Sequence, residues 1–302
     1  MSKRQQFFVY SVIVLAMMIW GMTFIWYKQV YAILRPLSLV FLRLLIASPL
    51  LIMVSLLLRK LQRIRREDLL SFMVLALFEP FLYFIGESFG LKMVSSTLGS
   101  VIVATIPLFA PIAPLVLFRE RFTLFNFAGI VVSIIGIIMV ISGESGFPGA
   151  TGLGVLLMFL AVFSAIGYSV LVKKLAVSYN SFSIVCWQNT IGLLYFVPLF
   201  LIFEWDHVMQ VEWTLPVIIP LVELALFGSA LAFVFFTFSI KKLGMARATV
   251  FTNLIPVFTA MFSFFILKDK ITLLKAMGIL IVIAGLLLTQ FNFRNTVKRR
   301  NT

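Results

Sequence analysis

One arrangement of residues occurs twice in this sequence, and the two copies lie 149 residues apart. The first copy has a proline at position 107, a charged triplet at 119–121, a threonine at 123 and glycines at 129 and 136. The second copy has the same kinds of residue at 256, 268–270, 272, 278 and 285. Because repeated segments fold by the same rules, we predict two domains of similar structure, residues 1–146 and residues 147–302.

Long apolar runs separated by short charged turns make up both copies. The chain is 62% hydrophobic and 12% charged, with a mean hydropathy of +1.12, whereas a soluble domain carries about 25% charged residues. Runs of about 20 residues can cross the hydrocarbon core of a bilayer as helices. We therefore predict an all-α integral membrane protein with ten transmembrane helices near 7–29, 38–58, 69–91, 95–118, 122–142, 151–174, 181–203, 214–240, 245–267 and 272–292.

Lysine and arginine are distributed unevenly between alternate loops. If the N-terminus is cytoplasmic, 18 of the 25 Lys and Arg residues fall on the cytoplasmic side, six fall outside, and Arg43 lies within a segment. Cytoplasmic loops are enriched in these residues, so we predict that both termini are cytoplasmic and that the protein is a multi-pass protein of the cytoplasmic (inner) membrane. The formal charge of +14 then reflects topology and not a nucleic-acid partner.

Ten helices in two copies place five helices in each copy. An odd number turns the second copy upside down relative to the first, which predicts an inverted-topology repeat. Two halves with the same packing but opposite orientation can open to either side of the membrane at similar energy. Alternating access depends on that property.

Ionisable residues inside the predicted helices are costly to bury and often functional. Glu79 lies in the middle of the third segment directly before Pro80, and a proline bends a helix. A carboxyl group at such a bend can bind a proton and release it when water enters. We predict that Glu79 contacts substrate and couples transport to protons, and the alternative is a carboxyl group that joins helices.

Three further ionisable residues lie in these segments. Arg43 and Glu87 fall at similar heights, so we predict a pair that neutralises both charges and acts as an outer gate. The alternative is that Arg43 reaches up to the membrane surface and Glu87 reaches headgroup water. Glu223 lies in the segment that corresponds to the third, but the position equivalent to Glu79 is Gly228. We predict that Glu223 contacts an asymmetric substrate, although sequence drift would give the same asymmetry.

Polar and aromatic side chains form a second group of candidates. Aromatic rings with amide groups suit a pocket for an amino-acid-like or aromatic solute, and hydrogen bonding between helices is the alternative. The predicted substrate-binding residues of this group are Trp20, Thr23, Tyr83, Trp187, Gln188, Asn189 and Asn253. Tyr27 follows Trp20 and Thr23 along the same face of the first segment.

Prolines, glycines and threonines at repeated positions have simpler structural roles. The prolines are expected to bend helices, the glycines to permit close helix packing, and the threonines to cap helices. The residues concerned are Pro107, Pro111, Pro114, Pro256, Gly99, Gly129, Gly136, Gly278, Gly285, Thr123 and Thr272.

The ten segments, the repeat, the Trp-Gly-Met-Thr-Phe sequence at 20–24 and the charged corners at 119–121 and 268–270 resemble the EamA branch of the drug/metabolite transporter superfamily. Asp269 stands where that family usually has Glu. The resemblance covers nearly the whole chain. It implies a ten-helix transporter with a central cavity between its halves, and small polar or amphipathic metabolites, often amino acids, that are usually exported.

We therefore predict a secondary active transporter of a small organic metabolite, an amino acid or related compound, with export and proton coupling as the expected mode. The alternatives are an exchanger or importer of a nucleotide-like or cofactor-like solute, a flippase for a lipid or lipid-linked intermediate, or a membrane enzyme or sensor. No phosphate-binding Gly-Lys-Ser/Thr loop, dinucleotide fingerprint or Cys/His metal cluster occurs, so we expect no enzyme activity, cofactor or metal. The expected partners are a small-molecule substrate, the lipid bilayer and protons, for a monomer or homodimer.

Overall fold

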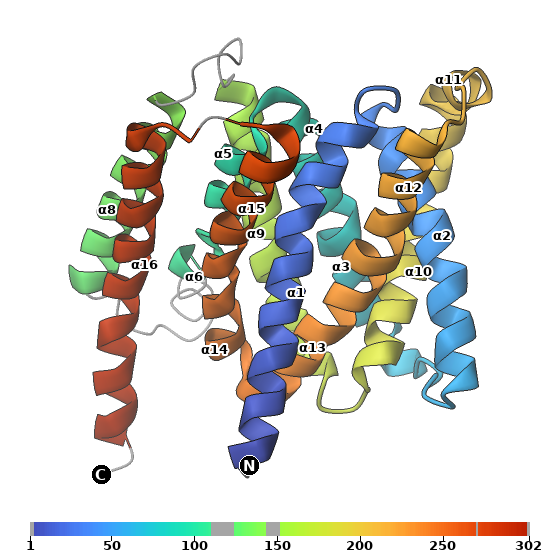
Figure 1. Cartoon of the computed structure of the whole chain (residues 1–302). Coiled ribbons are helices and arrows are strands. Elements are labelled where there is room, and N and C mark those ends of the chain that lie inside the picture. Colours follow the sequence, from blue (N-terminus) through green and yellow to red (C-terminus); the bar gives the residue numbers. More distant parts are fainter. Residues whose placement is uncertain (1–2, 110–123, 143–151, 270, 301–302) are drawn as a thin grey trace.

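The computed structural model describes residues 3–109, 124–142, 152–269 and 271–300, and every regular element within these ranges is a helix. The helices stand side by side as a bundle (Figure 1). Seven are long and apolar enough to cross a membrane, within 4–30, 36–57, 66–93, 152–175, 181–203, 215–243 and 247–267, and shorter apolar helices span 96–109, 127–140 and 273–285. The predicted all-α membrane protein is confirmed at this level.

The elements of the first half follow the predicted segments closely. They are α1 (Lys3–Val30), α2 (Pro36–Leu57), η1 (Arg66–Asp68), α3 (Leu69–Ala76), η2 (Leu77–Leu82), α4 (Tyr83–Met93), α5 (Ser96–Val103), α6 (Ile106–Phe109) and α8 (Leu124–Ser142). The N-terminus of α5 is capped by Ser95, whose hydroxyl accepts a hydrogen bond from the Leu98 amide at 3.1 Å. Proline at the first position of α2 suits a helix start because its missing N–H is not needed there.

The second half contains the corresponding helices and one additional short helix, α11. They are α9 (Gly152–Leu175), α10 (Ser181–Phe203), α11 (Trp205–Met209), α12 (Leu215–Glu223), η3 (Leu224–Leu231), α13 (Ala232–Leu243), α14 (Met245–Val250), η4 (Phe251–Leu254), α15 (Ile255–Phe262), η5 (Ser263–Leu267) and α16 (Leu273–Arg300). Thr272 caps α16 as predicted, because its hydroxyl accepts a hydrogen bond from the Lys275 amide at 3.3 Å.

The third and eighth predicted helices are interrupted by the π-helical turns η2 and η3. In η2 the backbone of Glu79 is extended (φ −146°, ψ 119°) before Pro80, since a proline ring restricts the preceding residue to extended conformations. Eight residues of regular helix would rotate Glu87 by about 80° relative to Glu79 around the helix axis. Because the helix is interrupted at Glu79, this angle does not hold here. Both turns lie near mid-helix, where wide turns often accompany functional sites.

Glycine faces bring α8 and α16 into close contact. A Cβ atom built on Gly136 would lie 2.7 Å from the Gly278 carbonyl oxygen, and one on Gly285 would lie 2.7 Å from the Gly129 carbonyl oxygen. Between these pairs the Ser133 hydroxyl donates to the Val282 carbonyl at 3.3 Å, and these two residues are themselves 149 positions apart. The predicted close packing at these glycines is confirmed. The predicted roles of Pro111, Pro114, Thr123 and the triplet at 119–121 fall outside the described residues.

Both chain ends lie at the same end of the bundle (Figure 1). The loop between α2 and η1 (residues 58–65) and the turn between α9 and α10 (176–180) lie there too. We call this the basic end, because Arg59, Lys60, Lys173 and Lys174 accompany these connections. The short helix α11, with Glu204 and Asp206, lies at the opposite end.

Candidate functional site

A small buried cavity lies in the middle of the bundle, where elements of both halves meet. Its volume is about 40 Å³, enough for a few water molecules and well below the roughly 300–1,000 Å³ of small-molecule sites. A small molecule of ordinary size could bind here only if the cavity expanded. The lining residues are Trp20, Thr23, Phe24, Arg43, Glu79, Tyr83, Phe84, Glu87, Val103, Ile106, Ala165, Tyr168, Ser169, Phe233, Phe236, Thr252 and Ile255.

Arg43 of α2 is held in this cavity by contacts on three sides. Its side chain is buried, and its Nε donates to the Ser229 hydroxyl of η3 at 2.7 Å. The guanidinium carbon lies 4.1 Å from the ring centroid of Phe84 and 5.3 Å from that of Tyr27, a geometry that favours a cation over an aromatic face. The alternative in which Arg43 extends to the membrane surface is wrong.

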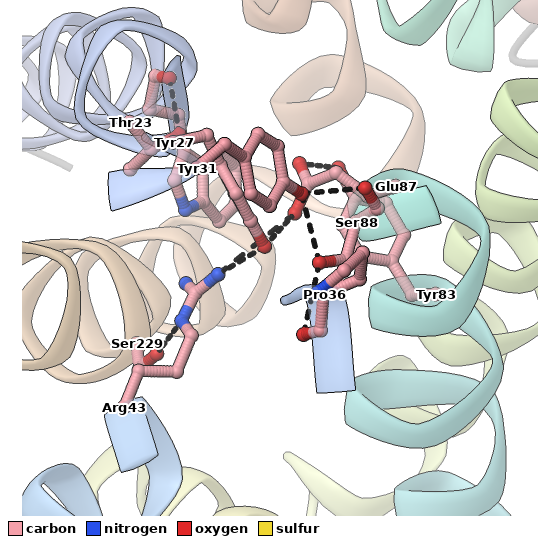
Figure 2. A network of polar contacts seen from close by, with 10 residues as sticks. Thr23, Tyr27, Tyr31, Pro36, Arg43, Tyr83, Glu87, Ser88 and Ser229 are labelled. Carbon is pink, nitrogen blue, oxygen red and sulfur yellow. Dashed lines mark hydrogen bonds and ion pairs between the residues drawn. The ribbon is translucent and has the colours of Figure 1, made fainter. Parts of the chain in front are cut away.

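The predicted ion pair between Arg43 and Glu87 is present, with 3.9 Å between Nη1 and Oε2. Tyr27 of α1 bridges the two charges, because its hydroxyl accepts from Arg43 Nη1 and donates to Glu87 Oε2 at 2.8 Å. The Tyr83 hydroxyl donates to the other carboxylate oxygen at 3.1 Å. Figure 2 shows these side chains converging from α1, α2 and α4. Both carboxylate oxygens are thus satisfied by neighbouring groups, and Glu87 does not reach headgroup water.

A second set of hydrogen bonds lies next to this network, on the side away from the basic end. The Tyr31 hydroxyl donates to the Ser88 carbonyl at 2.5 Å and lies 2.9 Å from the Ser88 hydroxyl. Ser88 in turn donates to the Pro36 carbonyl at 3.2 Å (Figure 2). These bonds fix α4 against the ends of α1 and α2, and so position Glu87.

Glu79 lines the same cavity but is not part of the network. Its side chain is buried, and within the described part of the chain it makes no hydrogen bond or salt bridge. A buried polar group without a partner is unfavourable unless water or a ligand satisfies it. The cavity therefore contains one cation with a protein counter-ion, Arg43, and one carboxyl group that lacks a protein partner.

The cavity brings together the predicted residues of α1 and α4. Trp20, Thr23 and Tyr83 all line it, and the Trp20 ring packs edge-on against Phe233 and Phe236 at 5.1 and 4.9 Å between centroids. The Thr23 hydroxyl donates its hydrogen to the Trp20 carbonyl in its own helix at 2.7 Å, so toward a ligand it can only accept a hydrogen bond.

Four predicted residues do not line the cavity. Asn189 donates to the Ser229 carbonyl at 2.8 Å and so lies one layer behind Arg43. Gln188 is buried, and among the described residues neither of its side-chain polar atoms has a hydrogen-bond partner, nor does Asn253 Oδ1. Trp187 lies at the basic end, where its indole N–H donates to the Gln62 carbonyl at 2.8 Å.

Glu223 does not join the central cavity. It lines a separate surface groove of about 490 Å³ between α1 and α12, with Met22, Trp26 and Gln29 of α1 and Ile219 of α12. Ile219 is 51% exposed, so the groove belongs to the outer surface of the bundle. In this conformation Glu223 therefore does not face the central cavity.

The sequence placed Tyr27 on one helical face with Trp20 and Thr23, but its contact with Arg43 was not predicted. Ser229, which also holds Arg43, was not selected as a site residue. Ser229 gave no signal, because its role depends on the turn η3. Among the described residues, no group of three or more His, Cys, Asp or Glu side chains could hold a metal ion.

Comparisons with known proteins agree with this architecture. Residues 7–142 and 152–291 each match the EamA-like transporter family. An uncharacterized transporter of Archaeoglobus fulgidus is 28% identical over 91% of this chain and 94% of its own length. The uncharacterized transporter YoaV of Bacillus subtilis is 24% identical over 91% of this chain and 94% of its own length. A solved crystal structure at 17% identity has a TM-score of 0.68 and covers 93% of this chain and 98% of its own, which supports the fold alone.

Proposed function

Because this chain belongs to the EamA-like transporter family, we propose that it is a secondary transporter that moves a small organic metabolite across the cytoplasmic membrane. The observation that carries the proposal is the buried cavity between the halves, which holds Arg43 and an unpartnered Glu79 among aromatic rings. A guanidinium and a carboxyl group in an apolar cavity can orient a solute, because the first favours a negative group of the solute and the second favours a positive one.

The proposed mechanism is alternating access by two inverted five-helix repeats, residues 1–146 and 147–302, which together give ten transmembrane helices. The contact between α8 and α16 supports this mechanism. Gly136 lies against Gly278, which is the equivalent of Gly129, and Gly129 lies against Gly285, which is the equivalent of Gly136. Ser133 contacts Val282, its own equivalent 149 positions further along the chain. Equivalent residues meet each other in this way where a twofold axis passes between two copies. An axis lying in the membrane plane relates halves of opposite orientation.

The proposed orientation follows from the distribution of charge, and the proposed direction follows from the resemblance to a family whose members usually export their substrates. With the basic end in the cytoplasm, both termini are cytoplasmic, and we propose export as the physiological direction. Glu79 is the proposed proton site, because a carboxyl group facing a cavity that admits water can exchange a proton with it. The outer-gate role of the Arg43–Glu87 pair is part of the same proposal.

The proposed substrate is an amino acid or a related zwitterion. Arg43 offers a guanidinium group suited to a carboxylate, and Glu79 offers a carboxyl group suited to an ammonium. Trp20, Phe84 and Phe236 offer apolar surface in the same cavity. Nucleotide-like solutes are a weaker candidate because they carry several negative charges, and this cavity also contains two carboxyl groups.

Amphiphiles are the second candidate, favoured by the groove at Glu223. This groove opens on the outer surface of the bundle between α1 and α12, where a lipid-like molecule could approach from the bilayer. A flippase would use this surface, whereas a metabolite transporter would use the central cavity. An enzyme or sensor has no such specific support.

The test is counterflow and gradient-driven uptake in proteoliposomes with amino acids, nucleotides and amphiphiles, preceded by a thermal-shift screen. Glu79→Gln should abolish proton dependence and lower transport of the responding solute at least tenfold, because it replaces an ionisable group in the cavity. Glu223→Gln is the matched control, since it makes the same change outside the cavity, and it should leave metabolite transport within twofold of the parent.

Loss of activity on an amphiphile in Glu223→Gln, with Glu79→Gln unaffected, would favour the flippase. Strict dependence on a counter-substrate would favour an obligate exchanger. Unchanged transport and pH dependence in Glu79→Gln would refute the proton-coupling role.

A further inference from the structure

At the basic end of the bundle, hydrogen bonds join the α2–η1 loop of the first half to the α9–α10 turn of the second. The side-chain oxygen of Gln62 accepts from the backbone and side-chain nitrogens of Asn180 at 2.7 and 2.8 Å. The Asn180 side-chain nitrogen also donates to the Lys60 carbonyl at 2.6 Å. Asn180 thus holds the loop at two points.

Residues on either side extend this contact. The Ser183 hydroxyl donates to the Lys60 carbonyl and accepts from the Gln62 amide, both at 2.8 Å. Trp187 donates to the Gln62 carbonyl at 2.8 Å. Tyr179 donates to Asp68 at 2.8 Å and accepts from the Arg65 amide at 3.1 Å. We call this set the latch, and its members are Lys60, Gln62, Arg65, Asp68, Tyr179, Asn180, Ser183 and Trp187.

The opposite end of the α2–α10 pair has a much sparser connection. Ser38 is the third residue of α2, as Ser183 is of α10, and its hydroxyl donates to Glu204 at 2.7 Å. Arg35, which precedes α2 as Asn180 precedes α10, makes no side-chain capping bond. Between the described segments 31–38 and 204–214, the Ser38–Glu204 bond is the one hydrogen bond.

We infer that the latch is the gate at the basic end and that it biases the resting transporter toward the conformation closed at that end. This inference rests on the proposed alternating-access function. If the two halves move in equivalent ways to open each end, then opening one end costs more free energy than opening the other only where the contacts at the two ends differ. Here the difference is several hydrogen bonds against one, and these bonds must break before a solute in the cavity can leave toward the basic end.

Cysteine accessibility tests the latch without a known substrate. Cys186 is the single cysteine of the chain and is buried, so the parent for labelling is Cys186→Ser. Ser169→Cys supplies the reporter, because Ser169 lines the cavity on α9 about one turn from Lys173. Labelling by a membrane-impermeant maleimide is measured in vesicles of each orientation, and we expect slow labelling from the face of the basic end.

Asn180→Asp is the variant that separates the latch from helix capping. It keeps the oxygen that accepts from the Ser183 amide at 3.0 Å, and it removes the donor to Lys60 and Gln62. We expect labelling from the basic end to rise about tenfold, the effect of losing one to two net hydrogen bonds. Gln62→Glu keeps the acceptor used by Asn180, so its labelling should stay within about twofold of the parent. Ser38→Ala weakens the opposite end and should slow labelling from the basic end or leave it unchanged.

Trp187→Phe removes the indole donor alone and should raise labelling about threefold, which keeps the test informative if Asn180→Asp does not fold. Unchanged labelling in folded Asn180→Asp and Trp187→Phe, each monodisperse and with the thermal stability of the parent, would overturn the inference. Failure of the proposed function has a different signature, namely absence of solute transport while labelling still depends on the latch.

Discussion

Glu87→Gln should destabilise the protein far more than the same change at Glu79. Glu87 and Arg43 are 4% and 2% exposed, and the substitution leaves the guanidinium buried without its counter-ion. An arginine cannot lose its proton in a protein, so the charge remains. Removing one partner of a buried pair costs about 3–5 kcal/mol. We expect about 3 kcal/mol, because the carboxyl group of Glu79 lines the same cavity and offsets part of the loss.

The reverse change has a smaller expected cost. In Arg43→Leu the remaining carboxyl group of Glu87 can bind a proton and become neutral, and Tyr27 and Tyr83 still hydrogen-bond to it. We expect a loss of about 1–2 kcal/mol, mainly from the unmade bonds to Ser229 and Tyr27. The double variant Arg43→Leu/Glu87→Gln removes both charges and should be no less stable than Glu87→Gln alone, so the two effects should not add.

The assay is reversible unfolding by SDS titration in mixed micelles, followed by tryptophan fluorescence. Glu79→Gln is the matched control, because it makes the same chemical change at a side chain without a salt bridge, and its free energy of unfolding should stay within about 1 kcal/mol of the parent. Equal losses at the two glutamates, or additive losses in the double variant, would show that the Arg43–Glu87 pair does not stabilise the cavity as argued.

Two predictions concern glycine packing and use the same titration. Gly192→Ala should lower the free energy of unfolding by about 1–3 kcal/mol, since its Cβ would lie 2.1 Å from Cγ of Pro80. A Cβ on Gly152 would meet no described atom within 4 Å, so Gly152→Ala should leave the free energy of unfolding unchanged or raise it by up to about 1 kcal/mol. An unchanged stability of Gly192→Ala would contradict the contact with Pro80. Gly136→Leu should destabilise the protein by separating α8 from α16, because even a Cβ would lie 2.7 Å from the Gly278 carbonyl oxygen. Ile138→Leu is the control and should have little effect, because Ile138 of α8 is 55% exposed. Equal stability of these two variants would exclude the packing described for α8 and α16.

The parts of the structure that depend on position along a helix axis were accessible from sequence. Hydropathy located the seven described helices that are long enough to cross a membrane to within a few residues, and the repeated glycines marked the contact of α8 with α16. The Arg43–Glu87 pair followed from equal height on neighbouring segments. Each of these inferences needs only residue spacing, which the rise of 1.5 Å per residue converts to depth.

Rotation about the helix axes was not accessible in the same way. The turns η2 and η3 are wider than a regular helical turn, so the helical period read from the sequence does not carry across them. Glu223 precedes η3 and faces the outer groove, while Ser229 lies within that turn and faces Arg43. Trp187 looked like a pocket residue because it interrupts an apolar run, and it instead donates to a loop carbonyl.

The two halves carry different ionisable residues, and this difference is possible only because both halves belong to one polypeptide and are not two identical subunits. Glu79 corresponds to Gly228, and α10, the counterpart of α2, contains no charged residue to match Arg43. An assembly of two identical five-helix subunits would duplicate every ionisable group, so a cation on one wall would face a second cation across the axis. Joining both copies in one polypeptide removes that restriction and permits a polarised interior, in which opposite ends of a single solute meet different chemistry.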